Sequence, residues 1–355
     1  MSNSQHFYQQ LKSTLAQESV VVATVIATVG SAPREVGAKM AVCADGSIIG
    51  TVGGGAGEGK VIEQALTMAN GEKRLVEIDL TGTPGKDSQG MCGGKVQLWL
   101  ERWAGRDAIA LVDQILDLFE SGKSGKLVTP LELDGVASSE NYQPYLTSER
   151  HLSDSNPQAF TEIIQPPPVL LIVGGGHIAV SLAQIASFSG FQVVVQDDRT
   201  EFMTAHRFPQ ATLLSLSLAK ALDYLTDHSQ RYIALVTRGY SQDLEALQTV
   251  LRRSLTYQYI GAVGSQKRIR LICQALEQQG ISIEQLTCFH APIGLDIGAL
   301  TPPEIAVSIC AELIKVYRGG TGLPLSHTKK PSSVKSSEKS PAKSHARSHV
   351  GSHVR

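Results

Sequence analysis

Hydrophobic residues in the first 165 positions form short strand-like runs that alternate with helical spacing. The run at 20–28 (VVVATVIAT) is rich in β-branched side chains, which is typical of a buried strand. An Asp-Gly turn at 45–46 joins two shorter apolar runs into a predicted hairpin, 39–43 with 48–52. The same pattern predicts strands at 73–80, 95–101 and 160–164, helices at 6–17, 60–69 and 106–119, and irregular structure around 134–160. We therefore expect a mixed α+β domain here.

The pattern changes after the proline triplet at 166–168, because consecutive prolines continue neither a strand ladder nor a helix. Apolar runs then alternate with helical segments, which indicates a parallel, doubly wound sheet of the Rossmann-like α/β class. The predicted strands are 169–173, 192–196, 211–215, 232–236 and 257–263, and the predicted helices are 177–189, 218–225, 243–253, 266–279 and 301–317.

Length and composition agree with this division. A chain of 355 residues, 42% of them apolar, is long enough for two domains with buried cores. We expect a first domain at 1–165, a Rossmann-like domain at 166–320 and a disordered basic tail at 321–355. The tail is rich in Ser, Lys, His and Pro, which cannot form a core. His345, His349 and His353 recur there at a spacing of four, which fits a flexible basic tail better than metal capture.

The charge distribution limits the classes of partner. The formal net charge is −1, and the seven basic residues and one acidic residue of 326–355 leave the rest of the chain at −7. We therefore expect no nucleic-acid partner. No apolar run reaches the roughly 20 residues of a membrane span, and the N-terminus has no apolar signal core. Five dispersed cysteines suggest neither a disulfide framework nor a zinc site, so the expected compartment is the cytoplasm.

The most specific motif is VLLIVGGGHIA at 169–179. Gly174-x-Gly176-x-x-Ala179 directly follows an apolar strand and begins a helix, as in a dinucleotide-binding fingerprint. Asp197 and Asp198 end the next strand, at about the distance where a carboxylate would bind a ribose. His177 could touch a phosphate or simply begin the helix. The glycine turn itself could bind a nucleotide, bind another ligand or serve packing alone.

Two further glycine-rich segments lie in the first domain. Residues 53–59 (GGGAGEG) stand between a strand and a helix, so their backbone amides could surround an anion, whereas Glu58 could simply favour the helix dipole. Residues 90–94 (GMCGG) place Cys92 among small residues, where amides would favour a thiolate that can bind a soft metal. A buried structural thiol is the alternative. The other four cysteines are expected in the cores.

Together these segments resemble the XdhC/CoxI family, maturation factors of molybdenum hydroxylases such as xanthine dehydrogenase. The matching stretches are ATVIATVGSAPREVGAKMAV, DGSIIGTVGGGAGEGKV, GMCGGKVQLWLE, LLIVGGGHIA, VVVQDDR, TRGYSQDLEAL, YIGAVGSQKR and PIGLDIGALTPPEIAVSICAELI. They cover both domains in order, from about residue 18 to 320.

The resemblance implies a non-catalytic chaperone that binds molybdenum cofactor, supports its sulfuration by a cysteine desulfurase and inserts it into the apoenzyme. The cargo is a phosphate-bearing pterin dithiolene with a thiophilic metal. The implied metal-binding residue is Cys92, and no catalytic residue is assigned. By position, the implied cofactor-binding residues are Cys92, Gly93, Gly94, Gly53, Gly54, Gly55, Glu58, Gly174, Gly176, His177 and Asp197.

One departure from the family matters. Some members carry further cysteines where this chain has Ala56 and Met91, so Cys92 would act as a single thiol. A homodimer is expected from the family and from the apolar helix at 305–316. An NAD(P)-dependent oxidoreductase is the alternative function, because the fingerprint and the acidic pair fit it. No convincing hydride-transfer partner, such as a Tyr-x-x-x-Lys pair, stands out to support it.

Overall fold

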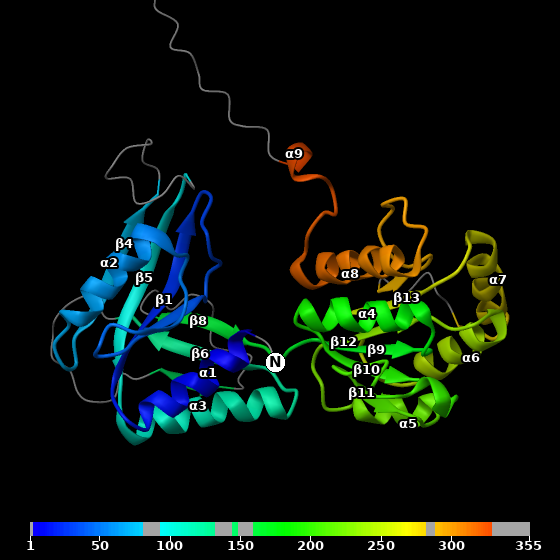
Figure 1. Cartoon of the computed structure of the whole chain (residues 1–355), viewed down its shortest axis with the longest axis horizontal. Helices are drawn as coiled ribbons and strands as arrows, with labels where there is room; N and C mark the ends of the chain where they lie inside the picture. The colour runs from blue at the N-terminus through cyan, green and yellow to red at the C-terminus, as the bar shows by residue number, and fades with distance from the viewer. Residues whose placement is uncertain (1–2, 81–92, 132–143, 148–158, 282–287, 329–355) are drawn as a thin grey trace, which may run out of the picture.

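The computed structural model describes residues 3–80, 93–131, 144–147, 159–281 and 288–328. These form two lobes that stand side by side in Figure 1, with the prolines at 166–168 between the last strand of one lobe and the first strand of the other. The lobes meet at a turn, where Ser229 N donates to Gly122 O at 2.7 Å and the hydroxyls of Ser124 and Ser229 lie 3.0 Å apart.

The first lobe contains an antiparallel five-stranded sheet in the order β3-β2-β1-β5-β4. Its strands are β1 (Val20–Val29), β2 (Lys39–Val42), β3 (Ile48–Gly50), β4 (Lys73–Asp79) and β5 (Lys95–Trp103). Side chains alternate across β1: Val20 and Val22 pack with α1 (Asn3–Leu15) and α3 (Gly105–Glu120), whereas Val21 and Ala23 pack with α2 (Gly55–Leu66). Both faces of the sheet are therefore buried.

A smaller antiparallel sheet completes this lobe, in the order β7-β6-β8. Its strands are β6 (Gly125–Pro130), β7 (Tyr145–Thr147) and β8 (Ala159–Ile164). The hydrophobic pattern predicted only the last of these. It also placed the start of α2 five residues too late, since the helix already begins at Gly55 within the glycine-rich segment.

The second lobe confirms the Rossmann-like prediction. Its six parallel strands have the order β11-β10-β9-β12-β13-β14, the 3-2-1-4-5-6 arrangement of dinucleotide-binding folds. They are β9 (Val169–Val173), β10 (Gln192–Gln196), β11 (Thr212–Leu214), β12 (Arg231–Leu235), β13 (Tyr259–Ala262) and β14 (Phe289–His290). The two-residue strand β14 was not predicted.

Helices cover both faces of the parallel sheet (Figure 1). α4 (His177–Phe188) and α8 (Pro302–Arg318) pack on one face, and α5 (Leu218–Tyr224), α6 (Tyr240–Leu251) and α7 (Gln266–Glu277) pack on the other. A short 3-10 turn (Thr200–Phe202) follows β10, and α9 (Leu325–Thr328) forms where disorder was expected. No helix within the described ranges combines the length and apolar character that a bilayer crossing requires.

Candidate functional site at the glycine-rich turns

Three glycine segments meet at one end of the five-stranded sheet. A methyl group on Gly94 would lie 2.4 Å from Ser31 O and 2.5 Å from Val29 O, and one on Gly30 would lie 2.9 Å from Gly93 O. The backbones of 29–31 and 93–94 therefore touch without intervening side chains. Gly53 joins them from a third segment, because a methyl group there would lie 2.5 Å from Cγ of Pro33.

The turn between β3 and α2 is open on its outer side. Gly54 and Gly55 have φ values of 78° and 68°, and an added methyl group would meet no atom of the described residues within 4 Å at either position. Gly54 is the N-cap of α2 and offers no side chain to the first amides of the helix. Glu58 instead accepts a hydrogen bond from Val52 N at 3.2 Å, which ties the helix to the end of the strand.

Gly93 and Gly94 extend the ladder between β4 and β5. Leu80 N donates to Gly94 O at 2.8 Å, and Gly93 N donates to Leu80 O at 3.0 Å. This pairing brings the predicted Gly93–Gly94 element to the same end of the sheet as 53–55. Cys92, the thiol of the predicted site, lies outside the described residues.

The charged residues of the loop between β1 and β2 do not together form a positively charged anion site. Lys39 forms a largely buried ion pair with Glu162 from β8, so its charge is already compensated. Arg34 is exposed. Glu35 reaches across to the other lobe, where Arg318 of α8 lies 3.7 Å away.

The predicted turn at 174–176 has the expected backbone geometry. Gly174 has a φ of 107°, and a methyl group there would lie 2.7 Å from Val236 O, so only glycine fits. Gly176 is the N-cap of α4 and has open space beside it. The first amides of α4 therefore receive no side-chain cap.

Asp197 is held by the turn itself. Its Oδ2 accepts from Gly175 N at 2.6 Å and from Nη2 of Arg199 at 2.7 Å, and its Oδ1 accepts from Nε of Arg199 at 2.9 Å. Burial would raise the pKa of this carboxyl, but the hydrogen bonds from Arg199 and Gly175 outweigh burial and hold the pKa well below its usual range. The carboxylate predicted to contact a ribose is thus fully engaged within the protein.

Phe202 and Arg207 also contact the turn at 174–176. Phe202 packs against Gly175, where a methyl group would lie 3.2 Å from its Cβ, and the guanidinium carbons of Arg199 and Arg207 lie 3.8 and 4.7 Å from the centre of its ring. Arg207 Nη2 also donates to Gly175 O at 2.8 Å. Side chains thus hold the middle residue of the turn from several directions.

His177 is the first residue of α4 and is exposed. It lines a shallow cavity of about 520 Å³ with Val180, Phe202, Arg207 and the two prolines that begin α8. The predicted residues Gly174, Gly176 and His177 are therefore together. Asp197 is close to them but bonded to Gly175, and the glycines of the first lobe belong to a separate turn.

The sequence analysis did not predict a buried hydrogen-bond network at the β13–β14 edge of the parallel sheet. Glu312 of α8 accepts from Tyr259 Oη at 2.6 Å and from Gly294 N at 2.8 Å, and its Oε1 lies 3.2 Å from His290 Nδ1. Burial would raise the pKa of Glu312, but hydrogen bonds from His290, Tyr259 and Gly294 lower it to about 2. No local motif signals this network, because Tyr259, His290 and Glu312 come together only through the packing of α8.

A second buried carboxylate lies in the first turn of α6. Asp243 is fully buried, accepts from Thr237 Oγ1 at 2.5 Å and pairs with Arg268. Burial raises the pKa of Asp243 although Thr237 and Arg268 oppose that shift. In the part of the chain that the structure describes, no three His, Cys, Asp or Glu side chains gather in a way that could hold a metal ion.

Two family models match this chain. The XdhC and CoxI family model matches residues 14–79, which include β1 to β4 with the turn at 53–55 and all of α2, and the XdhC Rossmann domain model matches residues 170–313. Together they cover more than half of the sequence. The chain belongs to the XdhC/CoxI family.

Curated relatives from two bacteria agree with this assignment. The chain is 26% identical over 314 residues to "Uncharacterized protein YqeB" of Escherichia coli (strain K12), a match that covers 88% of this chain and 46% of that protein. It therefore spans about half the length of that relative. It is 28% identical to a protein of Bacillus subtilis (strain 168) named as a probable xanthine dehydrogenase component, covering 88% and 98%. It is 27% identical to "Molybdenum cofactor insertion chaperone PaoD" of Escherichia coli (strain K12), covering 86% of each chain.

A solved structure has the same architecture. The chain matches the crystal structure of a xanthine dehydrogenase from Bacillus halodurans with a TM-score of 0.69 and 28% identity, over 90% of this chain and 96% of that one. The shared architecture therefore extends over both lobes and not over the Rossmann-like part alone.

Proposed function

We propose that this protein is a molybdenum cofactor-binding chaperone that protects the cofactor, supports its sulfuration and inserts it into a xanthine dehydrogenase-type molybdoenzyme. The observation that carries the proposal is the convergence of 29–33, 53–55 and 93–94 at one end of the five-stranded sheet, with an open turn at Gly54 and Gly55. The relative named as a molybdenum cofactor insertion chaperone supports the same function.

The chemistry of the cargo fits these elements. Backbone amides at the uncapped start of α2 would hold the phosphate of the pterin without a strong charge–charge contact. Cys92 directly precedes Gly93 in the sequence, and its thiolate would contact the thiophilic metal. One thiolate and a set of amides bind loosely enough for transfer, which a carrier requires.

The proposed partners are an apo molybdenum hydroxylase and a cysteine desulfurase, and the proposed compartment is the cytoplasm. We also propose that the carrier is a homodimer in which α8 contributes to the interface, since Val307 and Ile314 on this helix are 48% and 39% exposed. Light scattering would show a mass of about 76 kDa for a dimer, twice the 38.0 kDa of one chain, and a mass of one chain would contradict it.

The deciding experiment is anaerobic purification from cells that make the cofactor, followed by metal and pterin analysis. We expect about one equivalent of molybdenum and of pterin per chain, and at least a tenfold loss of both in Cys92→Ala. Cys288→Ala is the matched control, because that thiol is partly buried and packs against the core of the Rossmann-like lobe. Equal retention by wild type and Cys92→Ala would contradict the role of Cys92.

An NAD(P)-dependent oxidoreductase is the competing function, favoured by the 3-2-1-4-5-6 strand order and by the backbone of Gly174. The bonding of Asp197 to Gly175 and Arg199 gives it less support, since that carboxylate is no longer free to bind a ribose. NADH fluorescence titration separates the two functions. We expect no saturation below millimolar NADH, and micromolar affinity would favour the oxidoreductase.

A further inference from the structure

One side of helix α8 faces away from the core of the second lobe. In Figure 1 the helix lies along the upper side of this lobe, next to α4. Ala306, Ile309 and Leu313 are buried in the core, whereas positions at alternating spacings of three and four residues face outward. These positions, called the α8 stripe below, are Glu304, Val307, Ala311, Ile314 and Arg318. The α8 stripe therefore has an acidic end, a basic end and an apolar middle with a small residue at its centre.

The charges at the two ends of the α8 stripe are available to a partner. Glu304 accepts from Thr301 N at 3.0 Å and from Leu300 N at 2.8 Å, both through Oε2, and within the described residues no hydrogen bond reaches its Oε1. The bonds from Thr301 and Leu300 lower the pKa of Glu304, so the carboxylate is ionised near pH 7. At the other end, Arg318 is exposed, and the 3.7 Å between its Nη1 and Oε1 of Glu35 is beyond hydrogen-bond distance.

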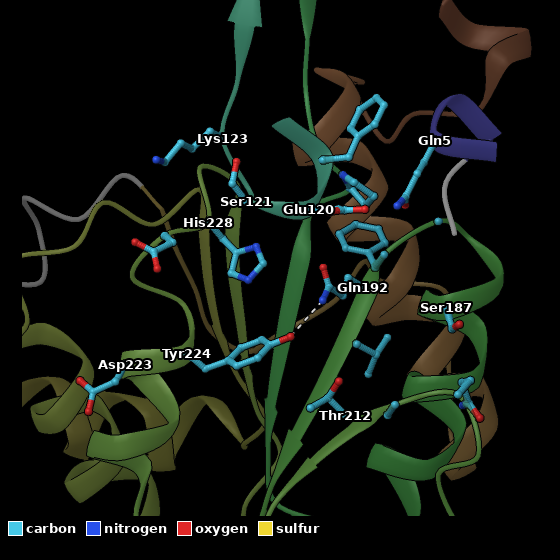
Figure 2. A pocket seen from close by; sticks show the side chains of 18 of the residues that line it. Gln5, Glu120, Ser121, Lys123, Ser187, Gln192, Thr212, Asp223, Tyr224 and His228 are labelled. Atoms are coloured by element: carbon cyan, nitrogen blue, oxygen red, sulfur yellow. Dashed lines mark hydrogen bonds between the residues drawn. The ribbon is translucent and has the colours of Figure 1, made fainter. Parts of the chain in front are cut away.

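An exposed aromatic residue lies beside the middle of the α8 stripe. Phe188, the last residue of α4, is 96% exposed. The preceding Ser187 lines the cavity between the lobes (Figure 2), whereas Phe188 lies outside that cavity. The hydroxyl of the following Ser189 is 3.5 Å from Sγ of Cys310, the neighbour of Ala311 in the sequence. Further exposed apolar side chains flank α8 in the sequence: Ile297, Leu300 and Leu323. Such a concentration is typical of a protein–protein interface.

The order of residues in the α8 stripe is complementary to itself. In a two-fold interface each contact occurs twice, with the roles of the two chains exchanged. Glu304 and Arg318 each lie seven residues from Ala311, so a two-fold axis at Ala311 places Glu304 opposite the partner's Arg318. Val307 and Ile314 lie four and three residues from Ala311, so they face each other across the axis to within one residue. The small side chain of Ala311 allows the helices to approach closely where they cross.

The charges distinguish between the two possible directions of a second helix. A parallel arrangement would bring Glu304 against the partner's Glu304 and Arg318 against the partner's Arg318, which is repulsive at both ends. The antiparallel arrangement pairs opposite charges at both ends. Charge complementarity therefore favours a second copy of this chain, in antiparallel orientation, as the occupant of the α8 stripe.

We propose that two copies of this chain associate by antiparallel packing of α8 on α8 about Ala311, with Glu304 of each chain paired to the partner's Arg318. This inference rests on the homodimer of the proposed function and specifies its interface. Phe188 packs along the side of the helix pair. Because Glu35 of the first lobe also lies beside Arg318, the interface reaches the loop between β1 and β2, and the five N–H donors of the guanidinium are enough for both carboxylates.

Disulfide crosslinking of the full chain tests the orientation. Ala311→Cys places a thiol on the axis, and we expect mild oxidation to link at least half of the protein into covalent dimers. In a mixture of Val307→Cys with a tagged Ile314→Cys protein, we expect the mixed disulfide to form at least tenfold faster than either disulfide between identical chains. Wild type controls for the native thiols, and Leu271→Cys controls for random collision, because Leu271 is exposed on α7 on the opposite face of the sheet.

Light scattering measures the contribution of the α8 stripe to association. Val307→Asp places a charge in the apolar middle and is expected to weaken the dimer at least tenfold, whereas Leu271→Asp is the matched control, since the two residues are 48% and 47% exposed. Arg318→Glu sets like charges opposite each other and should also weaken the dimer at least tenfold. Glu35→Ala removes only the contact within the chain and should leave the dimer unchanged.

The inference is overturned by a wild-type mass of one chain, by an unchanged dimer in folded Val307→Asp protein, or by equal yields of mixed and identical-chain disulfides. It is equally overturned if Ala311→Cys crosslinks no more than Leu271→Cys does. Circular dichroism shows whether each aspartate variant is folded, and if Val307→Asp is not, the cysteine variants decide alone. Failure of the carrier function would appear separately, as an absence of bound molybdenum and pterin, and would leave the crosslinking results unchanged.

Discussion

The turns at 53–55 and 174–176 are built from the same elements, but they differ in how closely side chains of the protein hold the residues of the turn. Each joins a strand to a helix through consecutive glycines and leaves the helix without a side-chain cap. In the second turn, Asp197, Phe202 and Arg207 hold Gly175 from its amide, its α-carbon and its carbonyl oxygen. In the first turn, no atom in the part of the chain that the structure describes lies within 4 Å of a methyl group added at Gly54 or Gly55.

This difference distinguishes a structural turn from a ligand-binding turn more clearly than the glycine motifs do. At 174–176 the amide and the carbonyl of the middle residue, Gly175, are bonded by the protein's own side chains, so a ligand would have to displace those bonds or use only the amides at the start of α4. A turn with free amides and open space can accept a ligand at little cost. The comparison therefore favours a ligand-binding role for the first lobe, and the following predictions test it.

The largest expected effect is at Asp197. Asp197→Ala leaves the guanidinium of Arg199 and the amide of Gly175 without their buried acceptor, so the free energy of unfolding should fall by about 3–5 kcal/mol. Urea denaturation followed by circular dichroism measures this change.

The neighbouring Asp198 provides the matched control. Its side chain is 76% exposed and lies 3.7 Å from Arg238, so Asp198→Ala should change the free energy of unfolding by no more than about 0.5 kcal/mol. Equal effects of the two substitutions would show that the turn at 174–176 is not held as described.

Glu312 is a second buried hydrogen-bond acceptor in the same lobe, and its contribution to the free energy of unfolding depends on pH in the acid range. Its pKa falls from 4.5 to about 2 on folding, so its contribution is present above pH 4.5 and is lost as the pH falls towards 2. The loss amounts to about 3 kcal/mol, from about 1.4 kcal/mol per pKa unit. Glu312→Gln should flatten this part of the stability–pH curve.

Unfolding at a series of pH values between 2 and 7 measures this effect. The same substitution at exposed Glu245 is the control for the loss of one charge. A Glu312→Gln curve that falls between pH 5 and pH 2 as steeply as that of wild type would contradict the assigned role.

The elements that could be predicted are those whose signal is local. Five consecutive apolar residues before a glycine fingerprint predicted β9 and α4, and the Thr-Pro-Pro-Glu start of the predicted α8 forms a capping box at Thr301 and Glu304. Two of the three missed strands depend on their partners instead. β7 and β14 have three and two residues, too few for a periodic pattern, and they exist because β6 and β13 pair with them.

The candidate site likewise has features that the local sequence predicts and features that it does not. The positive φ angles at Gly53, Gly54 and Gly174 follow from residue type, so the positions of the turns could be predicted. The hydrogen-bond partner of Asp197 could not be predicted. Whether its carboxylate binds a ligand or Arg199 depends on the conformation of the chain after β10. Glu312 lies 53 residues from Tyr259 in the sequence, and only the packing of α8 brings them together.

A smaller effect is expected within the open turn. Gly53→Ala places a methyl group 2.5 Å from Cγ of Pro33 and should cost about 2–3 kcal/mol of unfolding free energy. Gly54→Ala meets open space and costs only the backbone strain of its φ of 78°, about 1 kcal/mol. Urea midpoints of the two variants measure the difference. An equally large loss in Gly54→Ala would mean that this turn is also closed.

The smallest expected effect, and the most direct test of the open turn, is at Glu58. Its carboxylate accepts from Val52 N at 3.2 Å, so Glu58→Ala should lower the free energy of unfolding by about 1 kcal/mol, whereas Glu58→Gln keeps an acceptor and should lower it by less. The amount of pterin bound to each purified variant then separates two roles. If Glu58 only ties α2 to β3, Glu58→Gln retains pterin as the wild type does. If the carboxylate itself contacts the cargo, Glu58→Gln loses pterin although its stability is preserved, and Glu58 then belongs to the binding site rather than to its support.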